Sequence, residues 1–177
     1  AVLNETDGEY ESTALINGAH KGHIPVVEML LNRDGIAVDV QNKYGNSALI
    51  CAASEGHTRV AELLLQSNCA VDVQNKNGQS ALIPAVYNGH TRIVELLLQS
   101  NCAVDLQDKN GYSALTRAAA EGHTRIVELL LQSNCAVDLQ TEYGDSALIN
   151  AAAQGHTRIV ELLLQSNCAV DLQTEYG

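Results

Sequence analysis

The sequence predicts an all-α repeat solenoid, in which helix-turn-helix units with hairpin-like turns stack against one another. From Asn42 onward the chain repeats every 33 residues, and a fixed period of this size is typical of repeat architectures. Each copy contains two short segments whose apolar residues recur at helical spacing. A copy this short cannot bury its own apolar face, so a core forms only when neighbouring copies pack together.

The composition limits what that core contains and which partners the chain accepts. About 46% of the residues are hydrophobic, yet there is no Phe, no Trp and one Met, so Ala, Val, Ile and Leu must form the core. The formal net charge of −11 argues against nucleic acid or an anionic membrane surface as the main partner. No apolar run approaches the roughly 20 residues of a membrane-spanning helix.

The second half of each copy is nearly invariant. Segments 89–107, 122–140 and 155–173 all read GHTRIVELLLQSNCAVDLQ, and 56–74 differs from them at three positions. A divergent first copy matches at TALINGAHKGH and VVEMLL and carries one extra residue. We therefore expect an N-terminal segment at 1–7, a divergent first (capping) repeat at 8–41, repeats at 42–74, 75–107, 108–140 and 141–173, and the start of a truncated sixth repeat at 174–177.

The second copy shows the expected elements most clearly. Ser47 is a good N-cap for a first helix at 48–55, and the Gly-His pair that follows ends this helix. A second helix is expected at 58–66, with Arg and Glu three residues apart on its outer side. Asn68 stands where Asn commonly adopts a left-handed conformation after a helix. We expect 70–74 to form an extended arm that leads to the next turn.

The 33-residue period, the GHxxxVxLLL block and the turn-helix-helix order resemble the ankyrin repeat family over nearly the whole chain. The family's T-P-L-H signature appears here as Ser-Ala-Leu-Ile or Ser-Ala-Leu-Thr, so the side-chain network of its His should be missing. The resemblance implies stacked ankyrin repeats. It also implies a concave groove, lined by the turn tips and the first helices, where partners usually bind.

The copies differ from one another mainly in the turn tips and the first helices, whereas the outer faces of the second helices keep the same Thr, Arg, Glu and Gln. This asymmetry favours a non-catalytic protein–protein interaction module or scaffold that binds a protein or peptide along its groove. The residues expected to contact the partner are Lys43, Tyr44, Asn46, Ser54, Glu55, Lys76, Asn77, Gln79, Tyr87, Asn88, Lys109, Asn110, Tyr112, Arg117, Glu121, Glu142, Tyr143, Asp145, Asn150 and Gln154.

The tyrosines support the same surface, because Tyr combines a large contact area with a polar tip and is enriched at binding surfaces. All six are expected at turn or first-helix positions and none on a core stripe: Tyr10, Tyr44, Tyr87, Tyr112, Tyr143 and Tyr176. Lysines of the turns and Arg117 share this side. The groove should therefore be less acidic than the chain as a whole and accept an acidic or mixed peptide.

Four of the five cysteines recur at one position of the repeat, and Cys51 is the exception. We expect no disulfide among the cysteines and no metal site at either the cysteines or the histidines. Packed helices lie about 8–10 Å apart, beyond the roughly 7 Å that a disulfide allows between its Cα atoms. Five of the six histidines follow Gly between the two helices, where a bond to backbone is expected. No cofactor, catalytic group or metal ligand is expected, and reduced thiols fit a cytoplasmic or other reducing intracellular compartment.

Other functions stay open. The chain could be the targeting segment of a larger enzyme or regulator, or an engineered scaffold with no selected ligand. Near-identical copies fit both recent tandem duplication and engineering. The apolar stripe of the last second helix has no following repeat to cover it, so this uncapped C-terminal repeat is expected either to fray or to self-associate. Asn4-Glu5-Thr6 is a glycosylation sequon, although the cysteine usage argues against a secretory route.

Overall fold

The computed structural model describes residues 3–170 and 172. These residues contain ten α-helices, no β-strand and one isolated bridge between Thr6 and Thr13. The chain divides into two compact units, unit 1 at 1–102 and unit 2 at 103–177. The all-α repeat fold that the sequence predicts is therefore confirmed.

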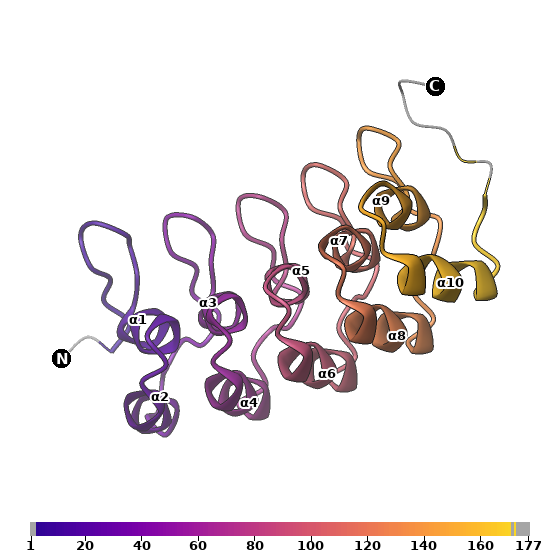
Figure 1. Ribbon diagram of the computed structural model, residues 1–177. Coiled ribbons are helices and arrows are strands. Elements are labelled where there is room, and N and C mark those ends of the chain that lie inside the picture. The colour runs from indigo at the N-terminus through magenta and orange to yellow at the C-terminus, as the bar shows by residue number, and fades with distance from the viewer. Residues whose placement is uncertain (1–2, 171, 173–177) are drawn as a thin grey trace. The chain divides into compact units, whose positions relative to one another are not determined.

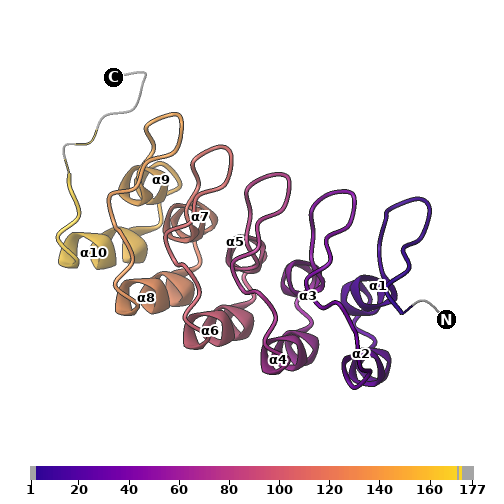
Figure 2. The same ribbon diagram turned by 180° about the vertical axis from the view of Figure 1, so that it is seen from behind.

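Unit 1 contains three helix pairs arranged in two layers (Figure 1). In the first layer α1 packs against α3 and α3 against α5, and in the second α2 packs against α4 and α4 against α6. The turns of this unit project beyond the first layer, as the view from behind also shows (Figure 2). The six helices are α1 (Ala14–His20), α2 (Ile24–Leu31), α3 (Ala48–Glu55), α4 (Thr58–Gln66), α5 (Leu82–Tyr87) and α6 (Thr91–Gln99).

Unit 2 repeats the same arrangement with two helix pairs. Here α7 packs against α9, and α8 packs against α10. The four helices are α7 (Ala114–Glu121), α8 (Thr124–Gln132), α9 (Ala147–Ala153) and α10 (Thr157–Gln165). The largest fully buried side chains of both units are Leu, Ile and Val, so the described core contains no aromatic ring.

The first helices begin where the sequence predicts, because a buried hydroxyl caps them. Ser47 Oγ accepts a hydrogen bond from the backbone N–H of Ile50, and Ser47 is only 3% exposed. In α7 the cap is reciprocal: Ser113 and Thr116 each accept from the other's backbone N–H. A buried hydroxyl without such partners would cost free energy, so these caps fix the start of each helix.

Helix α5 is the exception, because its sequence carries Pro84 where α3 carries Cys51. The N–H of Cys51 donates to Ser47 O over 3.1 Å, and this is the first helical hydrogen bond of α3. Proline has no N–H to donate. As a result α5 begins at Leu82, one residue later than α3 begins in its copy, and its N-cap Ala81 makes no side-chain cap bond.

The segment that joins one copy to the next is not the extended arm that the sequence suggests for 70–74. A turn at Val71 and Asp72 interrupts it. In the equivalent turn of the first copy, Asp39 points its carboxylate at the next copy and accepts from Ala70 N over 2.8 Å. This hydrogen bond links the turn to the next copy. The left-handed conformation predicted for Asn68 is confirmed, with a φ of 55°.

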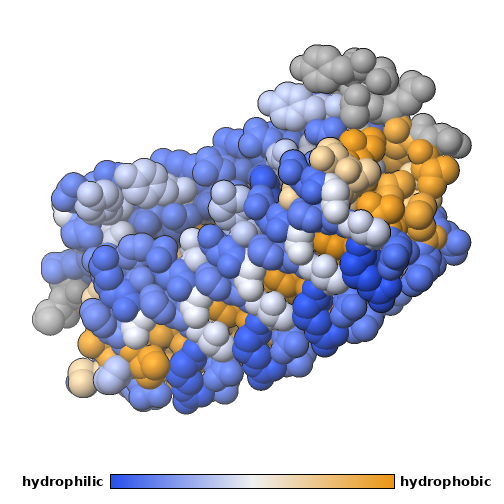
Figure 3. Space-filling model, viewed as in Figure 1, coloured by the Kyte–Doolittle hydropathy of each residue, from blue (hydrophilic) through white to orange (hydrophobic). Residues whose placement is uncertain are grey.

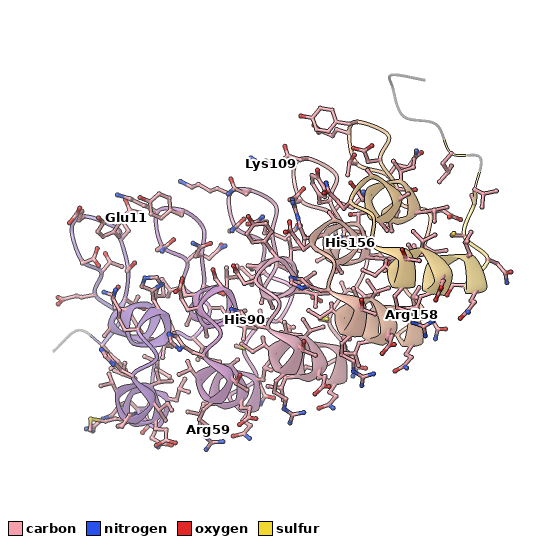
Figure 4. All side chains as sticks on the ribbon, in the orientation of Figure 1. Glu11, Arg59, His90, Lys109, His156 and Arg158 are labelled. Carbon is pink, nitrogen blue, oxygen red and sulfur yellow. The ribbon has the colours of Figure 1, made fainter. Side chains whose placement is uncertain are left out.

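The histidines between paired helices connect successive copies within each unit. In unit 1, His57 Nε2 bonds to the carbonyl of His20, and His90 Nε2 bonds to that of Ser54, each over 3.1 Å. In unit 2, His156 Nε2 bonds to Ala120 O over 3.3 Å. Figure 4 shows His90 and His156 at these turns. The backbone-bonded role predicted for the turn histidines is confirmed for these three.

The extra residue of the first copy lies in a loop that Asn4 holds in place. Asn4 Nδ2 donates to Gly35 O over 3.0 Å, and Asn4 Oδ1 accepts from Ala37 N over 2.9 Å. Both ends of this amide are therefore used to pin the N-terminal segment against the loop. A glycan on Asn4 would be incompatible with this packing.

Candidate protein-binding surface

Each turn tip is held by the side chain at its start. Asn42 Oδ1 accepts from the backbone N–H groups of Tyr44 and Asn46, each over 3.0 Å. Asp7 does the same at the first tip, where it accepts from Tyr10 N over 2.7 Å and from Asn17 Nδ2 over 3.1 Å. These hydrogen bonds to the charged form lower the pKa of Asp7. The tips are therefore ordered loops rather than free ends.

Neighbouring tips within a unit are also hydrogen-bonded to each other. In unit 1 the N–H of Lys43 donates to Tyr10 O over 2.9 Å, and the N–H of Lys76 donates to Tyr44 O over 3.0 Å. In unit 2 the N–H of Glu142 donates to Asn110 O over 3.0 Å. The side chains on these tips are thus presented at fixed spacing, a property that the repeat pattern alone does not reveal.

The residues expected to bind a partner all lie at the surface, on tips or on first helices and their C-terminal ends. Twelve of the twenty are exposed: Tyr44, Glu55, Lys76, Asn77, Tyr87, Asn88, Lys109, Asn110, Glu121, Glu142, Tyr143 and Gln154. The remaining eight are half-buried: Lys43, Asn46, Ser54, Gln79, Tyr112, Arg117, Asp145 and Asn150. In unit 2, Lys109 lies at a tip (Figure 4).

Four tyrosines are well exposed, although tyrosine is a large and partly apolar side chain. Tyr44 and Tyr87 are each 52% exposed, Tyr143 is 48% exposed and Tyr10 is 43% exposed. Tyr112 is half-buried, and Tyr176 lies outside the described residues. None of the five described tyrosines is in the core, as the sequence predicts.

Tyr10 and Tyr44 form a cluster with Lys43 at the first two tips of unit 1. Their ring centroids lie 6.3 Å apart, and Lys43 Nζ lies 4.3 Å from the Tyr10 centroid and 5.2 Å from the Tyr44 centroid. The ammonium also donates to Glu9 O over 2.7 Å. Cation–π contacts of this kind hold both rings in place, so the lysine supports the aromatic surface.

In unit 2 Arg117 is engaged by its own copy. Its guanidinium lies 3.7 Å from the centroid of the Tyr112 ring and pairs with the carboxylate of Asp108 over 3.6 Å. The Arg117 side chain is 17% exposed and that of Asp108 is 3% exposed. Arg117 is thus less available to a partner than the sequence suggests, because much of its charge is already compensated.

Two recesses adjoin each other on this side of unit 1. The larger has a volume of about 510 Å³, and the smaller about 220 Å³. They share three lining residues, His20, Asn46 and Cys51. The larger recess is lined by Tyr10, Ser12, Ile16, Asn17, His20, Lys21, Asn42, Tyr44, Asn46 and Cys51. The smaller is lined by His20, Asn46, Ile50, Cys51, Ser54, Glu55, Asn75, Asn77, Gln79 and Pro84.

Comparison with protein-family models decides the identity of this fold. A model of three ankyrin repeats matches residues 2–75, 56–141 and 82–175, which together span nearly the whole chain. The chain belongs to the ankyrin repeat family. Ankyrin repeats are generally protein–protein interaction modules, and their fold is typically non-catalytic. A search of curated proteins found no match.

The opposite side of the ankyrin repeats is occupied by ion pairs between invariant residues. Arg59 and Glu62 pair over 3.2 Å, and Arg92 and Glu95 over 2.9 Å. The same pair recurs in α8 and α10, and Arg59 and Arg158 point away from the first helices (Figure 4). The Arg–Glu pairs predicted on the second helices are therefore confirmed. Exposed pairs of this kind contribute only about 0.2–0.5 kcal/mol each.

The five cysteines of the ankyrin repeats are free thiols. Burial raises the pKa of Cys51, Cys69, Cys102 and Cys135 to about 11. The thiolate is the reactive form, so these thiols are poor nucleophiles at neutral pH. Among the residues that the structure describes, no group of three His, Cys, Asp or Glu side chains could hold a metal ion. In the same residues, no helix is long and apolar enough to span a membrane.

Proposed function

We propose that the chain is a non-catalytic binding module whose partner, a protein or peptide, lies along the concave groove between the turn tips and the first helices. One observation supports this most strongly. The positions that differ among nearly identical repeats coincide with ordered, surface-exposed side chains, including Tyr44, Tyr87 and Tyr143. Exposed aromatic side chains on a rigid backbone bind with little loss of conformational entropy.

The second helices provide the contrast. Their outer faces are also exposed, but they repeat the same ion-paired side chains in four copies. Drift alone should affect both exposed faces alike. The variation among the copies is instead restricted to the tips and first helices, and this favours selection or design for binding on that side.

The partner that fits this groove is an acidic or mixed peptide rather than nucleic acid. Lys43, Lys76 and Lys109 lie on the tips of a chain whose formal net charge is −11. Nucleic acid would require a broad basic surface. Arg117 adds less positive potential than its formal charge suggests, because Asp108 lies 3.6 Å from it.

The test begins with a partner found by an unbiased interaction screen. Alanine substitution of Tyr44 and Tyr87 should weaken its binding much more than alanine substitution of Arg59 and Arg92 on the second helices. Central aromatic anchors commonly cost about 2 kcal/mol or more when truncated. Equal losses at both sets would place the binding surface elsewhere. A scaffold without a selected ligand would yield no partner, and a targeting segment would bind as described but within a longer protein.

Self-association of the chain is a second proposed property, favoured by the apolar surface over α9 and α10 (Figure 3). Leu164 is 48% exposed, whereas its counterpart Leu131 in α8 is half-buried.

A reducing intracellular compartment is also proposed, since all five cysteines are free thiols and four of them are buried.

A further inference from the structure

The larger recess of unit 1 has Lys21 and His20 but no acidic residue in its lining. Two carboxylates contact that lining: Glu55 lies 3.8 Å from His20, and Asp7 accepts from Asn17 over 3.1 Å. Lys43 Nζ lies beside it, over the ring of Tyr10. In a chain with a formal net charge of −11, Lys21 and Lys43 are therefore the groups at this recess that can meet a negatively charged side chain.

The floor and walls of the recess suit a large apolar side chain. Its lining includes the buried Ile16 and Cys51 and the exposed Tyr10 and Tyr44, whose ring centroids lie 6.3 Å apart. A volume of about 510 Å³ lies within the range of sites that enclose small ligands. Aromatic rings prefer edge-to-face or offset contact with other rings, so these walls favour an aromatic side chain.

Side-chain amides continue from this recess into the smaller one. Asn17, Asn42 and Asn46 line the first, and Asn75 and Asn77 line the second. An amide side chain can both donate to a carbonyl and accept from an N–H group. Asn42 and Asn75 already use their amide oxygens to hold their own tips, and Asn17 Nδ2 donates to Asp7. The amide groups left to pair with the backbone of an extended peptide are therefore Asn46 Nδ2 and the side chain of Asn77.

We propose that the larger recess binds an aromatic side chain of an extended, acidic peptide, and that the residue at position 51 decides whether the recess is open. The acidic residues beside the aromatic anchor meet Lys21 and Lys43. The inference rests on the proposed function, because it assumes that the tips and first helices bind a peptide. It adds the class of peptide and the residue that controls access.

The role of position 51 follows from its counterpart in unit 2. Cys51 is small, is 7% exposed and lines both recesses. The equivalent residue, Arg117, instead extends over Tyr112 and reaches Asp108. An arginine of this kind placed at 51 would cross the recess. Asn42 and Asn46 occupy the positions of Asp108 and Tyr112, so three substitutions transplant the complete cluster.

The test uses the full chain and a fluorescent seven-residue Gly/Ser peptide with a central phenylalanine flanked by aspartates. Matched probes replace the phenylalanine with alanine, or the aspartates with lysines. We expect the first probe to bind at least about tenfold more tightly than either control, a difference of about 1.4 kcal/mol. Amide NMR shifts should map to Tyr10, Tyr44 and Asn46. No binding at millimolar concentration, or equal binding of the three probes, would overturn the proposal.

The transplant variant Asn42→Asp/Asn46→Tyr/Cys51→Arg leaves the net charge unchanged and should reduce affinity for the probe at least about tenfold. The control Gln66→Arg/Gln99→Asp adds the same two charges to exposed positions of α4 and α6 and should bind normally. Should the transplant fail to fold, Tyr10→Ala alters one exposed wall and should also lose affinity. Undiminished binding in a folded transplant contradicts the inference.

The outcomes also separate this inference from the proposed function. Suppose that Tyr87→Ala weakens the binding of a screened partner but the transplant variant does not. Groove binding would then stand, and the proposed role of the recess would be wrong. If alanine substitution of Arg59 and Arg92 weakens binding instead, both the proposed function and the role of the recess would be wrong.

Discussion

At the scale of single residues, Gly56 is required for two separate reasons. Its φ of +78° lies in the left-handed region, and a Cβ atom added there would lie 2.6 Å from Cε1 of His90. Gly155 has a similar φ of +74°, but an added Cβ would meet nothing within 4 Å. A substitution at Gly155 therefore tests backbone strain alone, whereas one at Gly56 tests backbone strain together with the contact to His90.

We expect Gly56→Ala to lower the free energy of unfolding by clearly more than Gly155→Ala. The second variant should cost about 1 kcal/mol, from backbone strain alone. The first should cost that amount plus the displacement of His90 from the carbonyl of Ser54. Urea denaturation of both variants measures the difference. Equal losses would show that the histidine contact contributes nothing.

The buried thiols predict a specific pH dependence. Burial and the nearby carboxylate of Asp39 raise the pKa of Cys69 from its ordinary value of 9.0 to about 11. The folded state therefore keeps a proton that the unfolded state loses first. The resulting stability is present below pH 9 and is lost as the pH rises towards 11.

The variant Cys69→Ala should show a shallower loss of stability between pH 9 and pH 11 than the unmodified chain. Lysines and tyrosines titrate in both proteins, so the difference between their profiles isolates the thiol. Urea melts at pH 8, 9, 10 and 11 measure it. Parallel profiles would mean that Cys69 is not buried in the folded protein.

At the scale of the helix, local signals made the elements predictable. The bounds 48–55 and 58–66 agree with α3 and α4 because a Ser cap, a Gly stop and apolar spacing all act within a few residues. The turn at 71–72 is not predicted correctly, because in such a turn an aspartate bonds to an amide of the next copy. The start of α5 differs from that of α3 because Pro84 lacks the N–H that Cys51 donates to Ser47.

The same division applies to the candidate surface. The sequence predicts which side chains lie on tips and first helices, because repeat position determines this. It does not predict the hydrogen bonds between tips, the contact of Arg117 with Tyr112 and Asp108, or the recess lined by Cys51. The bonds between tips join the backbones of successive copies, and the other two features depend on which side chains meet in space. The spacing of apolar residues along the chain does not determine these contacts.

Helix α5 supplies the prediction at this scale. Pro84→Ala restores an N–H that can donate to Ser80 O, as the N–H of Cys51 donates to Ser47 O in α3. We expect the free energy of unfolding to rise by about 1 kcal/mol and α5 to begin one residue earlier. A thermal melt with the matched control Cys51→Ala, which leaves that hydrogen bond in place, measures the effect. A lower melting temperature for Pro84→Ala would contradict it.

At the scale of the whole molecule, the 177-residue chain exposes Leu164 on α10 and Val170 just after it, and these apolar side chains should promote association. We expect light scattering to show a mass that increases with protein concentration, and Leu164→Lys to reduce this increase. Gln165→Lys adds the same charge at the neighbouring exposed residue and should have a smaller effect. A chain that stays monomeric at every concentration would contradict the proposed self-association.

The central claim for the whole molecule is that its variable, tyrosine-bearing side binds the partner and its invariant side does not. The most direct measurement is the affinity of a screened partner for Tyr87→Ala and Tyr143→Ala, two exposed tyrosines, compared with Arg92→Ala and Arg158→Ala. The account predicts a loss of affinity at the tyrosines alone, with unchanged melting temperatures. Equal loss at the arginines, or none at the tyrosines, would contradict it.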